Sequence, residues 1–413
     1  MFDPVRLERK PLDDEFQRCN LSLVAPGRFL TVAALFAGIG GIETGLARHG
    51  VRPELLCECW EPARAVLKER LPHVPLVGDI RGLRALPKVD VVAAGFPCTD
   101  LSQAGRTRGI EGKESSLVGE VFRLLRRRRA PVVLLENVRN MLVLDGGRAM
   151  RYLVTELETL GYRWAYRLVD SRFTGVPQRR HRVVLVAARE VDPRGVVLAD
   201  DAGEPDEQCF SDSTYGFYWT EGLRGLGWAK DAVPPLKGGS TIGIPSPPGI
   251  WHPMGAPGHR VLVPGIEEAE KMQGFKPGWT EPAHRVSKRK GTRWKLVGNA
   301  VSVGVGEWVG DRLASPAEPI LEGQPIRPGD PWPTAAWGAK GKAWKAHVST
   351  WPLRLPYRHL SEVVDLDSAL PLSVKGAAGF LKRARAGSLR FMPGFLDDIE
   401  SHVMFHEDDQ VVA

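Results

Sequence analysis

Residues 29–41 read FLTVAALFAGIGG, an apolar run that ends in a turn rich in glycine. Small and β-branched residues in a short apolar run are typical of a strand that is buried on both faces of a sheet. Glycines let the backbone adopt positive φ angles and approach a ligand closely, and the start of a helix can receive the polar end of that ligand. The stretch predicts a strand, a tight turn and a helix, a unit that dinucleotide-binding and S-adenosylmethionine-binding enzymes share. A purely structural turn is the alternative.

Strand and helix patterns alternate as far as residue 190. The further strand candidates are residues 55–60, 89–95, 132–136 and 182–188, and the helical patterns are residues 42–48, 62–70, 117–128 and 149–160. This alternation predicts an α/β fold, with a doubly wound, Rossmann-like parallel sheet and helices on both of its faces.

The pattern changes after residue 190. Residues 191–260 are rich in Gly, Pro, Asp and aromatic residues and lack a clear period, which predicts an irregular or short-stranded recognition domain. Helical patterns return at residues 266–272 and after residue 299, whereas the chain beyond residue 315 is rich in Pro and Trp. We therefore expect an N-terminal arm (1–28), a main domain (29–190) that resumes at 261–315, the recognition domain (191–260) and a C-terminal extension of unknown role (316–413).

Composition narrows the class of protein. Hydrophobic residues make up 43% of the 413 residues, and the formal net charge of +7 fits a polyanionic partner. No stretch is long and apolar enough to span a bilayer, and the N-terminus has no secretory leader pattern, so we expect a cytoplasmic protein without a membrane partner. The five cysteines are scattered and form no CxxC pair, which argues against a disulfide framework and against a metal site.

Acidic and aromatic residues follow the second and third apolar segments. In a Rossmann-like sheet, an acid at the end of the second strand binds the ribose of the cofactor. Either Glu58 or Glu61 could have this role, and Trp60 could stack on an adenine. Asp79 could accept a hydrogen bond from an adenine amino group, although a simple turn or N-cap aspartate is the alternative.

Three segments carry the residue types of a catalytic site. Cys98 follows Pro97 directly after a predicted strand, where a thiolate could attack an electrophilic ring carbon; a buried, inert cysteine is the alternative. Glu136 leaves an apolar strand and is a candidate proton donor with a raised pKa, or else a helix cap. In residues 178–182, QRRHR, at least one arginine is expected to bind a base edge or a phosphate.

In this order, these segments resemble the motifs of DNA (cytosine-5) methyltransferases. The matching stretches are FAGIGG (36–41), GFPC (95–98), ENV (136–138), QRRHR (178–182), EAEKMQGF (268–275) and GNAV (298–301), so the resemblance covers about residues 29–312. Two departures are Thr99, where Gln is common, and Lys276, where Pro is common.

The resemblance implies an enzyme that methylates C5 of a cytosine flipped out of duplex DNA. Cys98 would attack C6, Glu136 would hold the N3 and amino edge and assist protonation, and Arg182, with Arg180, would fix the ring. The methyl donor would be S-adenosyl-L-methionine, with S-adenosyl-L-homocysteine as product. Its pocket would be lined by Phe36, Ala37, Gly38, Gly40, Gly41, Glu58 (with Glu61 as second choice), Cys59, Trp60, Asp79, Ile80, Pro97, Asn299 and Val301.

The resemblance also implies how DNA is bound. A loop over residues 102–108 would close on the flipped base, with Ser102, Arg106 and Arg108 at the DNA. Residues 191–260 would be the target-recognition domain, in which Thr241 and Ile242 match a dipeptide of the family. We expect a monomer that acts on double-stranded DNA, with restriction or phage-defence proteins as possible partners.

Three other functions compete with this interpretation. The first is a tRNA cytosine-5 methyltransferase, because one branch of the family acts on tRNA, and the second is a non-catalytic DNA-binding relative. The third is a nicotinamide oxidoreductase, which would rest on the glycine turn alone. An oxidoreductase leaves the PC, ENV and QRRHR segments without a role.

Overall fold

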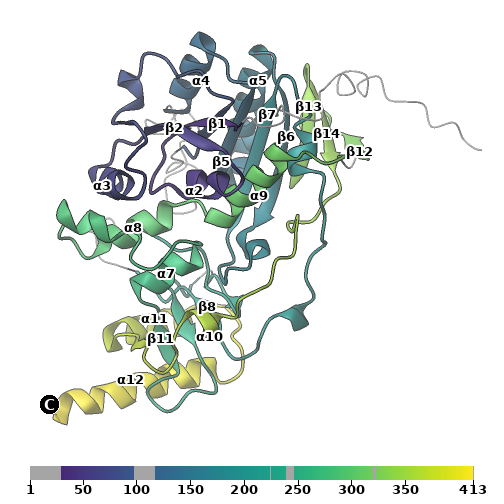
Figure 1. The fold of residues 1–413 in the computed structure, drawn as a ribbon. Helices are drawn as coiled ribbons and strands as arrows, with labels where there is room; N and C mark the ends of the chain where they lie inside the picture. The colour runs from purple at the N-terminus through teal and green to yellow at the C-terminus, as the bar shows by residue number, and fades with distance from the viewer. Residues whose placement is uncertain (1–28, 97–116, 224, 239–245, 320–321, 413) are drawn as a thin grey trace, which may run out of the picture.

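The computed structural model describes residues 29–96, 117–223, 225–238, 246–319 and 322–412, with the backbone alone at 408–412. Within these residues the strands form a ten-stranded sheet and a five-stranded sheet, and helices pack on both (Figure 1). No helix of the described residues has the length and apolar composition that crossing a membrane requires.

The large sheet has the strand order β12-β14-β13-β6-β7-β5-β4-β1-β2-β3. Its strands are β1 (Thr31–Leu35), β2 (Arg52–Cys57), β3 (Leu76–Val77), β4 (Val91–Ala94), β5 (Val132–Val138), β6 (Arg163–Asp170), β7 (His181–Ala188), β12 (Gly323–Pro325), β13 (Ala335–Ala339) and β14 (Lys342–Ala346). The neighbours β5, β4, β1, β2 and β3 pair in parallel. Their carboxyl ends meet at one edge of the sheet, which is the edge where open α/β sheets bind ligands.

The prediction of a parallel sheet holds for β1 to β5 but is wrong from β7 onward, because every further pair in the sheet is antiparallel. Strand β7 lies between β5 and β6 and is antiparallel to both. Only residues 171–180 connect β6 to β7, and they are too few for the crossover that a parallel neighbour needs. As a consequence, the start of β7, with Arg182, lies at the same edge as the carboxyl end of β5.

Helices cover both faces of the large sheet, as expected. On one face lie α2 (Gly41–Ala47), α3 (Glu61–Arg70), α6 (Arg194–Val197) and α9 (Val303–Ala314), and on the other lie α4 (Val118–Arg127) and α5 (Arg148–Thr159). Successive strand residues face opposite sides. In β4, for example, Val91 packs with the core of α2 and α9, whereas Val92 packs with that of α4 and α5.

The smaller sheet is antiparallel and has the order β15-β11-β10-β8-β9. Its strands are β8 (Tyr215–Phe217), β9 (Ala229–Lys230), β10 (Gly249–Trp251), β11 (Val261–Val263) and β15 (Leu370–Pro371), and its helices are α7 (Ile266–Met272), α8 (Gly291–Asn299), α10 (Leu360–Val363), α11 (Val374–Ala386) and α12 (Phe395–Val412). Fully buried phenylalanines, Phe217, Phe380 and Phe395, pack together where α11 and α12 cover the strands.

The C-terminal residues, whose role the sequence leaves open, take part in both sheets. Strands β12 to β14 extend the large sheet beyond β6, and β15 adds to β11 of the smaller sheet. The chain just after β7 stays with the large sheet, because Val197 and Phe210 pack in its core. The residues around the smaller sheet therefore come from two separate parts of the chain.

Candidate active site

The glycine turn that follows β1 has an unusual backbone. Phe36, Gly38 and Gly40 all have positive φ angles, of 56°, 57° and 84°. A positive φ is uncommon for a bulky residue such as Phe36 and is often found at functional sites. A Cβ added at Gly38 would meet no atom of the described residues within 4 Å, so within this part of the chain the turn faces open space that a ligand can enter.

Close packing of two helices fixes this turn against the last motif. A Cβ added at Gly41 would lie 2.2 Å from the carbonyl oxygen of Val301, and one at Gly45 would lie 2.3 Å from that of Val303. On the facing helix α9, Gly306 approaches the backbone of Ile42 in the same way. Because none of these glycines has a side chain, residues 299–303 can lie directly beside the turn.

Glu58 reaches from the end of β2 to the glycine turn. Its Oε2 accepts a hydrogen bond from the backbone N–H of Gly38 at 2.9 Å, and its Oε1 accepts one from Trp60 at 2.7 Å. Burial raises the pKa of this carboxyl group, while the backbone N–H donors counteract the rise. By contrast, Glu61 is exposed and lines a surface pocket with Lys68 and Arg285. The geometry favours Glu58 over Glu61 as the acid of the turn.

The other residues of the predicted cofactor pocket have different surroundings. Trp60 is half-buried and packs near Trp279, with the Nζ of Lys295 at 5.0 Å from its ring centroid. Asp79 caps the 3₁₀ turn Ile80–Gly82 by accepting from the N–H of Arg81, and it also pairs with the Arg81 guanidinium. Cys59 is exposed, Ile80 is buried in the core and Asn299 is exposed at the end of α8. The cap agrees with the alternative interpretation of Asp79 and leaves its cofactor contact a prediction.

Glu136 is the buried acid of the site. It is 8% exposed, and its Oε1 lies 2.9 Å from the Nε of Arg182 on the neighbouring strand β7. Burial raises the pKa of Glu136, and the positive charges of Arg182 and Arg180 counteract this rise. Its other oxygen, Oε2, lies 3.5 Å from the Cβ position of Gly95, which also comes within 3.7 Å of Val301. The carboxyl group, the end of β4 and the last motif therefore meet.

The residue after Glu136 holds the chain that leads to Cys98. The side-chain Nδ2 of Asn137 donates a buried hydrogen bond to the carbonyl oxygen of Phe96 at 3.3 Å. Sequence analysis assigned Asn137 no role of its own. An amide directly after a buried strand is the signal that could have indicated one, because such a group needs a hydrogen-bond partner.

Arg180 and Arg182 are both shielded from solvent but have different partners. The Nη2 of Arg180 donates to the carbonyl oxygens of Gly298 and Ala300, at 3.2 and 2.8 Å. Burial lowers the pKa of Arg180 and of Arg182, and the Glu136 carboxylate counteracts the shift of Arg182. Arg180 therefore binds the last motif to the main sheet, and a contact between Arg180 and a base stays a prediction.

Two buried glutamines that sequence reasoning missed also join the motifs. Gln178 accepts from the N–H of Leu236 and donates to the carbonyl oxygen of Met272. Gln273 donates to the carbonyl oxygen of Val297 and accepts from Ser302. Both side chains are fully buried and bridge segments that lie far apart in the sequence, so only the fold could reveal their partners.

Several predicted site residues lie outside the described residues. They are Pro97, Cys98, Ser102, Arg106, Arg108, Thr241 and Ile242. Their proposed roles rest on the sequence.

The site thus combines, in an α/β sheet, a glycine turn bound by Glu58 and a buried acid, Glu136, paired with an arginine. The family of C-5 cytosine-specific DNA methylases matches residues 30–207. The Type II methyltransferase M2.BsuMI of Bacillus subtilis (strain 168) is 44% identical over 90% of this chain and 97% of its own length. The chain therefore belongs to the C-5 cytosine-specific DNA methylase family and is a DNA methyltransferase.

Two more distant relatives are similar over smaller parts. The Type II methyltransferase M.BanI of Aneurinibacillus aneurinilyticus is 34% identical over 45% of this chain and 44% of its own. The Type II methyltransferase M.MspI of Moraxella sp is 27% identical over 70% of this chain and 72% of its own.

Proposed function

We propose that the enzyme methylates one cytosine within a short duplex DNA sequence, with Cys98 as nucleophile and with Glu136 and Arg182 binding the base. The observation that carries this proposal is the meeting of three segments: the Glu136 carboxyl group lies beside Gly95, three residues before Cys98, and is paired with Arg182. This places a cation and an acid next to the chain that bears the thiol.

Each residue has a defined task in this reaction. The thiolate of Cys98 adds to C6, which breaks the C5–C6 double bond and makes C5 nucleophilic. Glu136, with its raised pKa, holds the N3 and amino edge of the ring and supplies a proton to N3 as the electrons move. After C5 is methylated its proton passes to solvent, the double bond forms again as the thiolate leaves, and the N3 proton returns to Glu136. Arg182 fixes Glu136 and the ring throughout.

The glycine turn fits a nucleoside-type cofactor. Gly38 faces open space, Glu58 points to the turn and the Trp60 ring is partly accessible. S-adenosylmethionine would lie over this turn, with the Glu58 carboxylate at its ribose, and when bound it supplies the methyl group. Because Glu58 already accepts two backbone hydrogen bonds, its orientation is fixed before the ligand arrives.

The five-stranded sheet and its helices would form the DNA-recognition part. Tyr218 follows β8 and lies close enough to Arg180 and Arg182 for their charges to affect its pKa, which burial raises. The Nζ of Lys237 lies 3.5 Å from the centroid of its ring. These side chains belong to the smaller sheet and lie near the catalytic arginines, so they would contact DNA around the flipped cytosine.

Expression in a bacterium without cytosine methylation, followed by bisulfite sequencing, tests the function. We expect protected cytosines in a single short sequence, and none with Cys98→Ala at equal soluble expression. Absence of protection with folded wild-type protein would contradict a DNA-methylating activity. Comparing methyl incorporation into duplex DNA and into tRNA in vitro separates the two substrates.

A further inference from the structure

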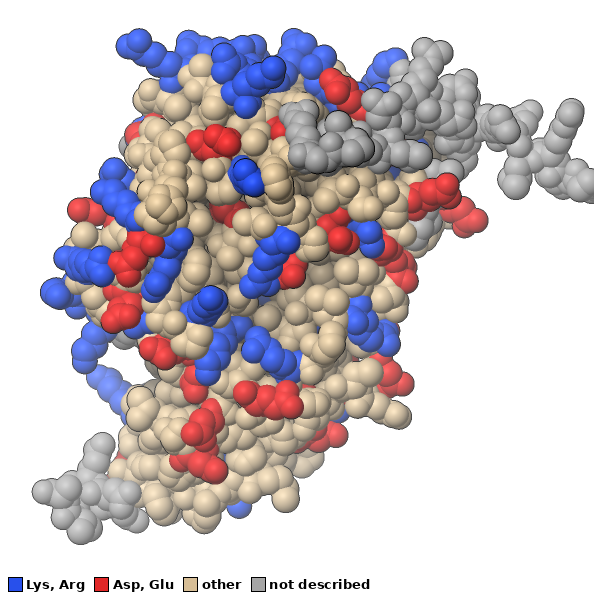
Figure 2. Space-filling model, in the orientation of Figure 1, with Lys and Arg blue, Asp and Glu red and all other residues tan. Residues whose placement is uncertain are grey.

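The edge of the large sheet opposite to the candidate site is strongly basic. Lys88 precedes β4, Arg129 precedes β5 and Arg189 follows the antiparallel β7, so all three lie at the ends of strands remote from Glu136. Arg84 and the end of α4, with Arg127 and Arg128, add to them. We call the exposed residues Arg84, Lys88, Arg127, Arg128, Arg129 and Arg189 the basic edge. Figure 2 shows Lys and Arg side chains gathered along the upper rim of the molecule, where Figure 1 places α4.

Hydrogen bonds to the backbone make the basic edge continuous. The Nη1 of Arg127 donates to the carbonyl oxygen of Arg84 at 2.7 Å, and the Nη1 of Arg128 donates to that of Leu86 at 2.8 Å. On the other side, the N–H of Arg189 donates to the carbonyl oxygen of Pro131 at 3.2 Å. The loop before β4, the end of α4, the start of β5 and the end of β7 are thereby held together.

These contacts leave the positive charge uncompensated. Each guanidinium has five N–H donors, and a neutral carbonyl oxygen occupies one without cancelling the charge. The neighbouring Arg126 pairs with Glu156, and the exposed Glu190 follows Arg189, so acids are present but are outnumbered. One large apolar side chain, Phe29, is exposed at this edge before β1, and the guanidinium of Arg52 lies over its ring, 3.6 Å from the centroid.

This composition fits a phosphate backbone better than a protein surface. Protein interfaces have an apolar core that is depleted of charge, whereas interfaces with DNA are polar and strongly positive. Arginine is suited to phosphates because its planar group can donate two parallel hydrogen bonds. Duplex DNA carries about one negative charge per 1.7 Å of helix axis, a charge density that favours binding to a surface where several arginines lie together.

We propose that the basic edge binds the backbone of a second segment of duplex DNA while the candidate site holds the first. Strand β5 has seven residues, so about 20 Å of sheet separates the two edges. Duplex DNA is stiff over about 150 base pairs, so one short duplex cannot reach both edges. The enzyme would then bridge two duplexes, or two distant parts of one long DNA.

A bridging assay with the full chain tests the proposal. Protein is bound to an immobilised duplex of about 30 base pairs, three helical turns. A fluorescent duplex of unrelated sequence is then added, and its retention is measured against salt concentration. The test variant is Lys88→Gln/Arg129→Gln/Arg189→Gln, because among the described residues no side-chain hydrogen bond ties these three to the fold in the way that Arg127 and Arg128 are tied. The matched control, Arg327→Gln/Lys345→Gln/Arg354→Gln, removes the same charge from exposed positions outside both the basic edge and the proposed DNA-recognition part.

We expect the wild type and the control variant to retain the second duplex. The test variant should retain at least about fivefold less of the fluorescent duplex. Each phosphate contact contributes about 0.9 to the slope of log binding against log salt, so the slope should fall by about 3 in the test variant. Binding to the immobilised duplex and the melting temperature report whether the variant is folded. Equal retention by the two variants would overturn the proposal. So would a wild type that retains no second duplex but binds polyglutamate, since the surface would then suit an acidic protein. None of these results depends on methylation.

Discussion

Around the glycine turn, chain segments lie so close that one added methyl group would overlap a backbone oxygen, whereas around Glu136 charged side chains make the contacts within an apolar sheet. We call the first region the cofactor half (residues 36–41, Glu43, Glu58, Asp79 and Val301) and the second the cytosine half (Glu136, Arg180 and Arg182). The difference teaches that the two halves should respond to different changes. The cofactor half should be sensitive to added volume and the cytosine half to lost charge.

The largest effect is expected in the cytosine half, from Glu136→Gln. This change keeps the shape but removes the proposed proton donor and leaves Arg182 without its ionic partner. General acid catalysis contributes about 10²–10⁴-fold, so the single-turnover rate of methyl transfer should fall by that range. Affinity for the methyl donor should stay within about twofold, because the glycine turn is unchanged.

The control for this prediction is Glu156→Gln, which removes the partner of Arg126 far from the site. An exposed ion pair contributes only about 0–1 kcal/mol, so the rate should be that of the wild type. A rate for Glu136→Gln within threefold of wild type would remove Glu136 from the reaction.

A buried acid in the cofactor half offers a way to break the comparison. Burial raises the pKa of Glu43, on α2, to about 7, and the nearby negative charge of Glu58 also favours the protonated form. The ordinary pKa of a glutamate, which applies in the unfolded chain, is 4.5. Between these values the folded protein holds the proton more tightly. The contribution of Glu43 to the free energy of unfolding is therefore fully present below the pKa that it has in the unfolded chain. This contribution is lost as the pH rises through about 7, and the total loss is about 3 kcal/mol.

Glu43→Gln should remove this pH dependence. Denaturant unfolding gives the free energy of unfolding at pH 5 and at pH 8. The decrease between these two values should be smaller in the variant than in the wild type, by about 3 kcal/mol at most. The exposed Glu54 on β2 provides the control, Glu54→Gln, which should behave as the wild type. If the loss between pH 5 and pH 8 were the same in all three proteins, Glu43 would not be protonated in the fold, and no part of the cofactor half would depend on charge in this way.

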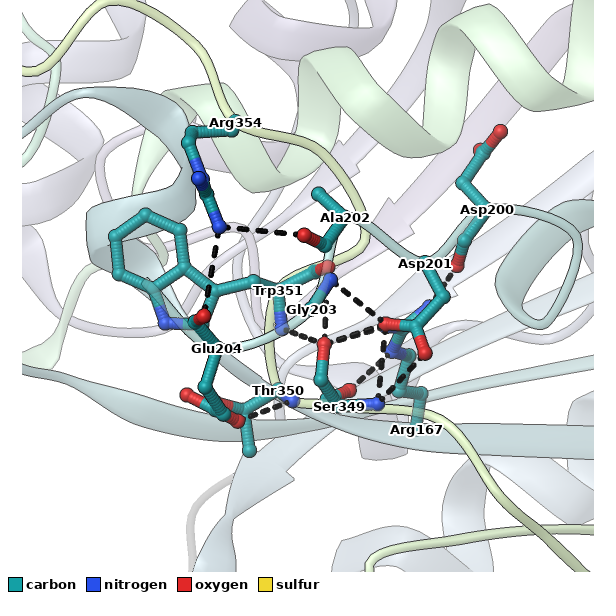
Figure 3. Close-up of polar contacts among 10 residues, drawn as sticks. All are labelled: Arg167, Asp200, Asp201, Ala202, Gly203, Glu204, Ser349, Thr350, Trp351 and Arg354. Atoms are coloured by element: carbon teal, nitrogen blue, oxygen red, sulfur yellow. Dashed lines mark hydrogen bonds and ion pairs between the residues drawn. The ribbon is translucent and has the colours of Figure 1, made fainter. Parts of the chain in front are cut away.

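The strand that sequence reasoning missed shows why burial of charge is hard to predict. Residues 163–170, RWAYRLVD, contain two arginines, and a charge within a strand argues against burial on both faces. Arg167 is nevertheless fully buried in β6. It pairs with Asp201 at 2.9 Å and donates to the carbonyl oxygen of Ser349 at 2.8 Å (Figure 3). Asp201 and Ser349 lie on the two connections between the large sheet and the smaller sheet, and both are far from Arg167 in the sequence.

The same limit applies within the site. Local patterns predicted α2 to α5, α7 and α9, the parallel strands β1, β2, β4 and β5, and the place of the motifs at strand ends, because apolar periodicity and glycines are visible along the chain. Whether an arginine binds ligand or protein depends on distant partners. Arg180 and Arg182 stand two residues apart in one motif, yet Arg180 donates to carbonyl oxygens more than a hundred residues away, and Arg182 pairs with Glu136.

The sensitivity of the cofactor half to added volume can be tested at two glycines that have different surroundings. In Gly41→Ala the new Cβ would lie 2.2 Å from the Val301 oxygen, so the backbone must shift, at a cost of about 2 kcal/mol of unfolding free energy. Gly38→Ala meets no atom and only adopts an unfavourable positive φ, at about 1 kcal/mol. If the cofactor lies over the turn, Gly38→Ala should nevertheless weaken its binding, measured by calorimetry, about tenfold. Cofactor affinity unchanged in Gly38→Ala would place the ligand elsewhere.

The smallest effect is expected from substitution of Asp79, whose predicted contact with the cofactor is a single hydrogen bond. Asp79 caps the turn Ile80–Gly82 and pairs with Arg81 on the surface, and an exposed pair of this kind contributes little to stability. If Asp79 also accepts from the adenine amino group, Asp79→Ala removes one hydrogen bond of about 1 kcal/mol and weakens cofactor binding about fivefold. Asp79→Asn keeps an acceptor for both the cap and the amino group, so it should bind within twofold of wild type. Equal affinity in all three proteins would make Asp79 only a cap, and the cofactor half would then hold its ligand through the glycine turn, Glu58 and packing.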